Sequence, residues 1–312
     1  MPEPQPVSLS ALLARFRQAP CPFYERRLDA AGFKRLADLD ARSWARVPLT
    51  RHEDILHDQL EHLPHGTRRF RNAEHPVRAG ISGSGDGLLV LTWTAADLAG
   101  ERAAGTRLLQ RLGVTPGMRV ANTLPGALAT PGALLLGDSI EELGALDIPL
   151  GVIDSDSAAR GAWELMDRVL PDVVILDIAS APRLFAAAPA AARGWWRGII
   201  WLRDASDPGA AAAAPPATGF TGWQRAWLAV AEATSFVAHS CAALRFHAND
   251  HVLVEVVDEA TGATAEPGQV GTLVLTPLAG DTLLLRYASG IRARAVPPPC
   301  ACGAEGVGLE LN

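Results

Sequence analysis

The sequence predicts an α/β fold, a doubly wound parallel sheet followed by an antiparallel β module. Between residues 88 and 202, short apolar strand patterns alternate with helical patterns at the spacing of strand–helix–strand units. After residue 250 the helical patterns stop, and apolar strands follow one another with only turns between them. At 312 residues the chain is long enough to bury a large core.

Residues 1–77 are predicted to be an N-terminal helical segment. A first amphipathic helix is indicated by apolar residues at helical spacing, namely Leu9, Leu12, Leu13 and Phe16. The stretch "PFYERRLDAAGF" (22–33) gives a second short helix. Residues 50–75 are rich in charge and histidine, and we expect a solvated helix and loop there. Their histidines are too loosely spaced for a metal site, namely His52, His57, His62 and His65.

Residues 78–249 are predicted to form the α/β body. The buried strand "LLVLTW" (88–93) leads into a helix that Thr94 caps, with Asp97 three residues later as a capping box. Gly113 ends that helix. The following elements are predicted in order: a strand within 113–126, a helix and a strand within 132–151, a helix at 157–170, strands at 172–178 and 198–202, a low-complexity surface loop at 203–221, and a last helix at 222–233.

Residues 250–312 are predicted to form the β module. Its strands are "HVLVEVVD", "GTLVLTPL", "TLLLRYA" and "IRARAV", joined by turns such as "EATG" and "EPGQ". The module ends in Cys300-Ala-Cys302.

The bulk composition argues against several classes of protein. A formal net charge of −6 speaks against a nucleic-acid partner. No apolar run reaches about 18 residues, so no membrane span is expected. The N-terminus lacks the pattern of a secretion signal, which favours a cytoplasmic location with reduced thiols. The four cysteines then suggest a metal site before a disulfide.

The order of these elements resembles the phenylacetate–CoA ligase branch of the adenylate-forming enzymes. The likeness is carried by "PFYERRLDAAGF" at the front, "PPPCACG" at the back, and three long blocks at 112–150, 171–185 and 251–290. It covers essentially the whole chain and implies the large N-terminal domain of such an enzyme. The family activates a carboxylate with ATP, and CoA then displaces AMP from the acyl-adenylate.

Two nucleotide motifs that the resemblance implies are altered in this sequence. The phosphate loop matches Ser82, Gly83, Ser84 and Gly85, followed by Asp86 near the place of the family's lysine. A carboxylate beside a phosphate costs about 4 kcal/mol per charge pair at 4 Å and an effective dielectric near 20. In the Tyr-Gly-x-Ser/Thr-Glu motif only Glu232 remains, and Leu228 stands in place of the tyrosine that flanks adenine. The alternative for Glu232 is the polar end of a helix.

Two further features of the family also differ. The ribose-binding motif reads Arg286-Tyr287-Ala288-Ser289-Gly290-Ile291, where isoleucine replaces the aspartate. The sequence ends at Asn312, where the hinge into the family's mobile lid would begin. The only lysine, Lys34, lies in a predicted early helix and cannot replace the catalytic lysine of that lid. We therefore expect no use of ATP or magnesium, and we interpret the glycines of 82–87 as a turn that no triphosphate visits.

The resemblance also implies a zinc site. The matching residues are Cys241, His247, Cys300 and Cys302, with His239 or His251 as alternatives for the imidazole. Three thiolates and one imidazole form a closed tetrahedral site, which predicts a structural zinc that ties the β module to the α/β body. If one thiol is not a ligand, a catalytic zinc becomes the alternative.

Other site residues follow from the same resemblance. The acyl pocket loop persists at 123–132, where the pocket would be lined by Leu124, Ala127, Leu128 and Thr130; core packing behind a strand is the alternative. The candidates for acid–base catalysis are Glu232, Ser235, His239 and Asp250.

Three functions remain open at this point. The first is a ligase relative that no longer adenylates and instead acts on an acyl or aryl thioester of CoA or a carrier protein. The second is an ATP-dependent ligase whose lid is supplied by another chain. The third is a non-catalytic scaffold, in the form of a homodimer through the surface that the lid would cover.

Overall fold

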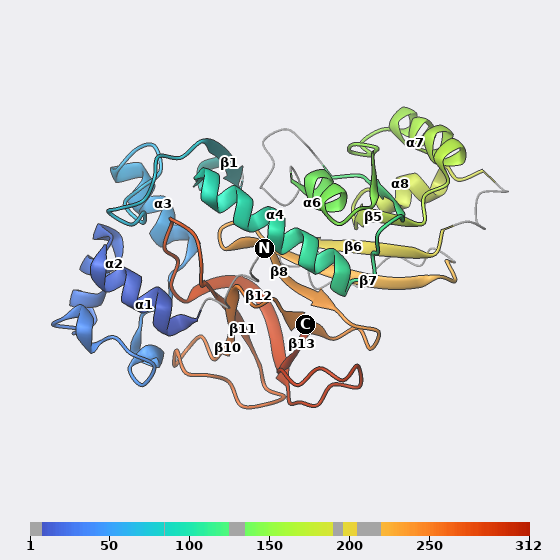
Figure 1. Cartoon of the computed structure of the whole chain (residues 1–312). Helices are drawn as coiled ribbons and strands as arrows, with labels where there is room; N and C mark the ends of the chain where they lie inside the picture. The colour runs from blue at the N-terminus through green and yellow to red at the C-terminus, as the bar shows by residue number, and fades with distance from the viewer. Residues whose placement is uncertain (1–7, 84, 125–134, 190–195, 205–219) are drawn as a thin grey trace.

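The computed structural model describes residues 8–83, 85–124, 135–189, 196–204 and 220–312 (Figure 1). None of the helices formed by these residues has the length and apolar character of a bilayer-crossing segment. The helices are α1 (Leu9–Gln18), α2 (Pro22–Ala30), α3 (His52–Glu61), α4 (Ala95–Arg111), α6 (Leu136–Glu142), α7 (Asp156–Val169) and α8 (Ala181–Ala186). The strands are β1 (Arg78–Ser82), β2 (Leu89–Trp93), β3 (Arg119–Asn122), β4 (Leu146–Pro149), β5 (Val173–Asp177), β6 (Gly198–Asp204), β7 (Trp223–Val230), β8 (Thr234–Ser240), β9 (Phe246–Ala248), β10 (Val252–Val257), β11 (Val270–Pro277), β12 (Tyr287–Val296) and β13 (Gly308–Leu311).

One large sheet organises these elements and confirms the predicted fold class. Its strand order is β10-β11-β12-β13-β9-β8-β7-β6-β5-β3-β4. Strands β4, β3, β5, β6 and β7 pair in parallel, and the pairs from β7 to β10 are antiparallel. The parallel half is the doubly wound sheet, and the antiparallel half contains the predicted β module. The predicted boundary at 249/250 falls between two strands of this sheet, and the division into three parts stays a prediction.

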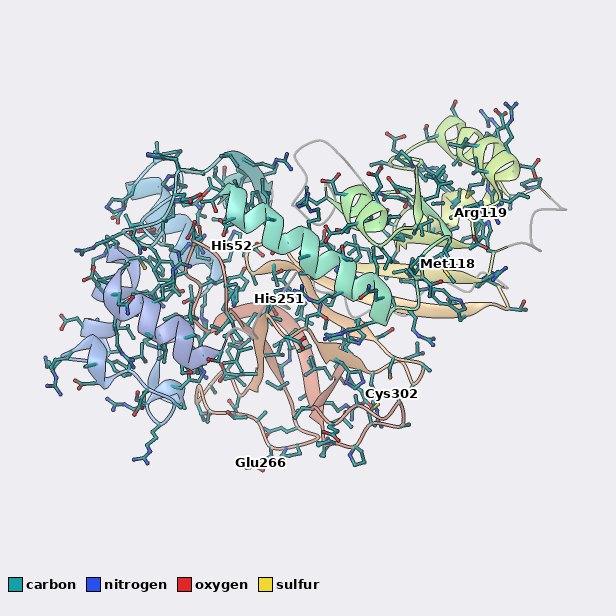
Figure 2. The ribbon with its side chains drawn as sticks, in the orientation of Figure 1. His52, Met118, Arg119, His251, Glu266 and Cys302 are labelled. Atoms are coloured by element: carbon teal, nitrogen blue, oxygen red, sulfur yellow. The ribbon has the colours of Figure 1, made fainter. Side chains whose placement is uncertain are left out.

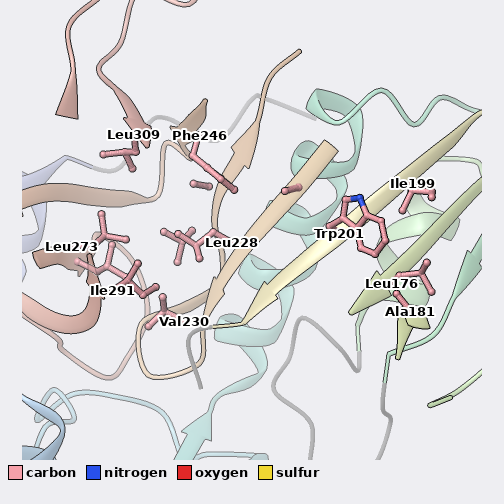
Figure 3. Close-up of a cluster of buried hydrophobic side chains, with 14 of the residues drawn as sticks. Leu176, Ala181, Ile199, Trp201, Leu228, Val230, Phe246, Leu273, Ile291 and Leu309 are labelled. Carbon is pink, nitrogen blue, oxygen red and sulfur yellow. The ribbon is translucent and has the colours of Figure 1, made fainter. Parts of the chain in front are cut away.

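Apolar cores lie on both faces of the sheet. On one face, helices α4 and α6 pack on the sheet through residues that include Leu108, Ile140, Ile175 and Phe236. On the other face, Trp163 of α7 and Leu184 of α8 pack against Leu176 and Trp201. This second core continues from β5 through β7 to β11 and β12, as Figure 3 shows for Leu176, Leu228, Leu273 and Ile291.

The N-terminal helices pack against the β module. Phe16 of α1 and Leu28 of α2 share an apolar cluster with Leu283 and Leu285 from the loop before β12. The Tyr24 hydroxyl accepts a hydrogen bond from the Leu285 N–H at 2.8 Å. Residues that are far apart in sequence are therefore joined, and α1 and α2 lie at one end of the molecule with α7 and α8 at the other (Figure 1).

Local capping rules predicted α4 correctly. Thr94 Oγ1 accepts from the Asp97 N–H at 3.1 Å, and the Asp97 carboxylate accepts from the Thr94 N–H at 2.8 Å. The helix ends at Arg111, and Gly113 follows with φ +94°. The start and the end of α4 together determine which face of the helix covers the sheet.

The predicted helix at 222–233 is wrong, because residues 223–230 form strand β7. Five consecutive residues, 226–230, are buried, and their side chains alternate between the two cores: Trp227 packs with one and Leu228 with the other. A strand between two neighbours is apolar on both faces, and such a run does not alternate in sequence. Lys34 also lies in a bend after α2 rather than in a helix.

Candidate functional site

A cavity of about 640 Å³ lies between α4, β2 and the antiparallel half of the sheet. Its walls come from α4 between Ala96 and Arg107, residues 90–93 of β2, the turn 231–234, residues 250–251, and the loop 277–284. Arg15, His65 and Arg68 from the N-terminal segment complete the wall. Figure 2 shows His251 beneath α4, near the middle of the molecule. The volume is within the usual range for small-molecule sites, which makes this cavity the candidate site.

Three polar residues meet on its wall. Thr234 Oγ1 donates to Glu101 Oε1 at 2.8 Å and lies 3.1 Å from His251 Nε2. The Ser235 N–H donates to Glu101 Oε2 at 3.2 Å. Burial raises the pKa of Glu101 to about 7, against the effect of these hydrogen bonds. Burial lowers the pKa of His251 to about 4, so its imidazole is neutral at pH 7. Glu101 therefore exchanges a proton most readily near neutral pH.

Glu232 has a different environment in the turn between β7 and β8. Ser82 Oγ donates to Glu232 Oε1 at 2.5 Å, and His52 Nδ1 lies 3.6 Å from the same oxygen. Burial by itself would raise the pKa of Glu232, but the contacts with His52 and Ser82 outweigh it and lower that pKa. The contact with Glu232 raises the pKa of His52. The carboxylate is thus paired within the chain. It stands in a turn and not at the end of a helix.

The glycine loop closes the hairpin of β1 and β2. His52 Nε2 lies 2.6 Å from the Gly87 carbonyl oxygen, and a Cβ on Gly83 would lie 2.6 Å from that oxygen and 3.5 Å from His52 Cε1. The inner side of the loop is therefore occupied by a carbonyl and an imidazole. Asp86 is exposed, and Ser84 lies outside the described residues.

The other residues matched to nucleotide motifs face the interior. Arg286 is 1% exposed and donates to the carbonyl oxygens of Ala45, Val47 and Gly262 at 2.8, 2.8 and 2.9 Å. It also forms an ion pair with Glu255 at 3.4 Å. Ile291 and Leu228 are fully buried in the core. These side chains therefore pack in the interior and support the fold.

The four predicted metal ligands come together at the end of the β module. The ligand atoms of Cys241, His247, Cys300 and Cys302 all lie within 4.8 Å of one another. Sγ of Cys241 is 3.8 Å from Sγ of Cys300, and Sγ of Cys302 is 3.4 Å from Nε2 of His247. A tetrahedron with Zn–S bonds of about 2.3 Å has edges of about 3.8 Å, which fits these distances. Figure 2 shows Cys302 well apart from His52 and His251.

The alternatives for the imidazole are not part of this cluster. His251 lines the cavity, and the ring centroid of His239 lies 6.0 Å from that of His247. Among the described residues, His247 is the histidine that completes the ligand set.

The four predicted acid–base residues do not form one group. Glu232 and Asp250 line the cavity, although Asp250 forms an ion pair with Arg111 at 2.7 Å. Ser235 follows Thr234 and donates its N–H to Glu101. His239 lies about 13 Å further along β8, pairs with Trp227, and is not among the cavity residues described.

The predicted acyl pocket is only partly visible. Leu124 is buried in the core beside α4 and β3, with 6% of its surface exposed. The other three predicted residues, Ala127, Leu128 and Thr130, lie outside the described residues. Their role stays a prediction.

Sequence reasoning missed Glu101, Thr234 and His52 as site residues. Glu101 and Thr234 are 133 positions apart and come together only because α4 lies across β8. One local signal was available, since Thr234 lies two positions after Glu232. His52 had been assigned to a solvated helix, and nothing in its segment indicates a contact with residue 232.

Neither a protein-family model nor a curated protein matches the sequence. Among solved structures, a 2-hydroxyisobutyryl-CoA ligase in complex with 2-HIB-AMP and CoA matches with TM-score 0.82 and 22% identity, over 96% of this chain and 66% of that chain. A long-chain-fatty-acid-CoA ligase from Archaeoglobus fulgidus matches with TM-score 0.55 and 10% identity, over 77% of this chain and 51% of that chain. An amide bond synthetase from Marinactinospora thermotolerans matches with TM-score 0.50 and 17% identity, over 77% and 50%.

Proposed function

We propose, on the premise that the chain has the fold of the adenylate-forming CoA ligases, that it acts on an acyl thioester without adenylating a carboxylate. The shared fold confirms the fold class that the resemblance implied, and the chain spans about two thirds of the length of the first of these ligases. The acyl group would arrive already activated, on CoA or on a carrier protein. Hydrolysis or transfer of that group then needs no ATP.

The observation that carries this proposal is that groups of the chain itself fill the inner side of the glycine loop. A triphosphate needs free backbone N–H groups and a cation, whereas this loop presents the Gly87 carbonyl, the His52 imidazole and exposed Asp86. Glu232, at the position of the family's magnesium ligand, is already bound by Ser82 and His52. The guanidinium of Arg286 is not available to a nucleotide, because three backbone carbonyls accept its hydrogen bonds.

The chemistry that remains is proton transfer at Glu101. In hydrolysis, water attacks the thioester carbonyl carbon, the new C–O bond forms, and the C–S bond breaks. Water must lose a proton and the departing thiolate must gain one. Because Glu101 has a pKa of about 7, it is suited to take the first proton and return it to sulfur. The Thr234 hydroxyl, which also contacts the neutral His251, fixes the orientation of the carboxyl.

The test is thioester turnover with ATP rigorously absent. Release of free thiol from acyl-CoA or acyl-N-acetylcysteamine is expected, and Glu101→Gln should lower kcat by about 10²- to 10⁴-fold. Glu164→Gln, on the exposed face of α7, is the matched control and should leave turnover unchanged. Glu232→Ala and His239→Ala test the residues predicted from sequence. Turnover that appears only with ATP and magnesium, together with heat of ATP binding by calorimetry, would refute the proposal.

We also propose that the Cys/His cluster holds a structural zinc ion. The donor set, three sulfurs and one imidazole nitrogen, suits zinc in a closed four-coordinate site. Four protein ligands leave no open position for a substrate. Zinc there would join the turn after β8 to the turn before β13 and so link the neighbouring strands β8, β9 and β13.

A further inference from the structure

The carboxylates around the cavity are all paired within the chain. Asp97 accepts from the N–H groups of Thr94 and Asp281. Asp281 in turn forms an ion pair with Arg15. The carboxyls of Glu101, Glu232 and Asp250 have the partners described above. None of these groups needs a cation from a ligand.

Arg68 has no such partner, although it lines the same cavity. The residue is 2% exposed, and its Nε and Nη1 atoms form no hydrogen bond with any described residue. No carboxylate of the described chain lies within ion-pair distance of its guanidinium. The carboxylate of Asp58 acts on it from further away and is already bound by Arg26 and Thr67. Burial consequently lowers the pKa of Arg68.

The backbone holds Arg68 firmly in this place. The Leu283 N–H donates to the Arg68 carbonyl at 3.0 Å, and Arg69 forms a bridge with Thr282. The segment is thus paired with the loop 277–284 that forms one wall of the cavity. A buried cation without a counter-charge is unfavourable, so a fixed position for one points to a ligand that supplies the charge.

A second cation adds to this imbalance. Arg107 of α4 also lines the cavity and has no hydrogen bond or ion pair with the described residues. It is half-buried and close enough to His251 to lower the pKa of that imidazole. On the described wall of the cavity, Arg68 and Arg107 are therefore two cations without an ion pair, whereas each carboxyl there has a hydrogen bond or an ion pair within the chain.

We infer that the cavity binds an acyl group that carries a carboxylate of its own, remote from the thioester, and that Arg68 pairs with this carboxylate. This inference rests on the proposed function. Apolar residues such as Val90, Leu91 and Leu284 line the same cavity and suit the carbon chain between the two ends. A guanidinium matches a carboxylate in charge and in planar hydrogen-bonding geometry. The substrate class is thus a monothioester of a dicarboxylic acid.

The test compares two N-acetylcysteamine thioesters of equal length, glutaryl and pentanoyl, by calorimetry on the unmodified protein. These probes carry no phosphate, so only the acyl carboxylate differs. We expect glutaryl thioester to bind at least about tenfold more tightly, as for a hydrogen bond to a charged group. Equal affinities would overturn the inference.

Variants separate a binding role of Arg68 from a structural one. Arg68→Met should abolish the preference for glutaryl thioester, while Arg160→Met, an exposed arginine on α7, should keep it. Without ligand, Arg68→Met should unfold at the same temperature as the unmodified protein or above it, because a buried unpaired charge is removed. A clear fall in that temperature would mark Arg68 as structural and contradict the inference.

Two further measurements complete the test. One asks whether the bound anion comes from another source, and the other separates this inference from the proposed function. If 4′-phosphopantetheine binds better than pantetheine in an Arg68-dependent way and glutaryl shows no preference, the anion is the carrier's phosphate and the inference is wrong. If both thioesters turn over equally well without ATP, the proposed function stands and the inference fails. If glutaryl thioester binds with the expected preference but is never cleaved, the inference stands and the proposed reaction fails.

Discussion

Two glutamates on the cavity wall show how single residues set the chemistry of the site. Glu101 is bound only by neutral donors, a hydroxyl and a backbone amide, so burial dominates and its pKa rises. Glu232 contacts an imidazole and a hydroxyl, and its pKa falls. At neutral pH one carboxyl can carry a proton and the other remains charged, which is the division of roles that acid–base catalysis uses.

The raised pKa of Glu101 has a consequence for stability. Its folded-state value of about 7 exceeds the ordinary 4.5, so the native state binds the proton more tightly. Stability from this group is fully present below about pH 4.5 and is lost as pH rises to about 7, by at most about 3 kcal/mol. Glu101→Gln removes this dependence. Urea denaturation at pH 5 and pH 8 should therefore show the variant gaining stability relative to the unmodified protein at the higher pH, and a constant difference would contradict the shift.

For Arg286 we expect the opposite effect, a loss of stability when the side chain is replaced. Arg286→Met removes the donor from one buried and two partly buried carbonyl oxygens and the cation from Glu255, and we expect a loss of about 3 kcal/mol or more in the free energy of unfolding. Arg292→Met, at an exposed position of the β12 strand that follows Arg286, should cost less than about 1 kcal/mol. Urea denaturation of both variants checks this. Similar small losses would mean that Arg286 is not structural.

At the scale of elements, what the sequence could predict depended on how local the cause is. The Thr94–Asp97 cap of α4 and the turn glycines act within a few residues, and the structure agrees with both. Whether residues 223–230 form a helix or a strand depends on their pairing with β6 and β8 on either side, and no local sequence pattern reveals that pairing. The alanines of that segment favour a helix by propensity, and burial between two strands overrides it.

The metal cluster allows a prediction about the elements that it joins. Cys302→Ser should remove bound zinc and lower the unfolding temperature by at least about 4 °C, because metal binding stabilises the folded state. Cys21→Ala is the control, since Cys21 is buried in the N-terminal cluster far from these ligands in sequence. It should retain one zinc per chain by elemental analysis. Hydrogen exchange should rise mainly in β9 and β13, and equal zinc content in both variants would argue against the site.

For the whole molecule, the continuity of the sheet decides how the chain unfolds. Eleven of the described strands form one hydrogen-bonded sheet, and one core runs from β5 to β12. We therefore expect one cooperative unfolding transition, with fluorescence and circular dichroism giving coincident curves. Two separate transitions would instead support independent α/β and β parts divided near residue 249.

The candidate site was predictable only where the family motifs reach it. The predicted metal ligands, which the resemblance implied, come from two short segments, 241–247 and 300–302, and the structure brings them together. The described wall of the cavity is assembled from seven separate stretches of the chain, and its unpaired Arg68 has no signature in sequence. Whether a charged side chain is compensated is a property of the folded surroundings, so such residues become visible only in the structure.

Both outer strands of the sheet are protected against the addition of another chain. At one end, β4 has only four residues, ends in Pro149, which has no N–H to donate, and carries the half-buried Asp147. At the other end, the Ala265 N–H donates to the Val256 carbonyl at 2.8 Å, so the turn after β10 covers part of its free edge. Edge-to-edge pairing through these two outer strands of the large sheet is therefore disfavoured.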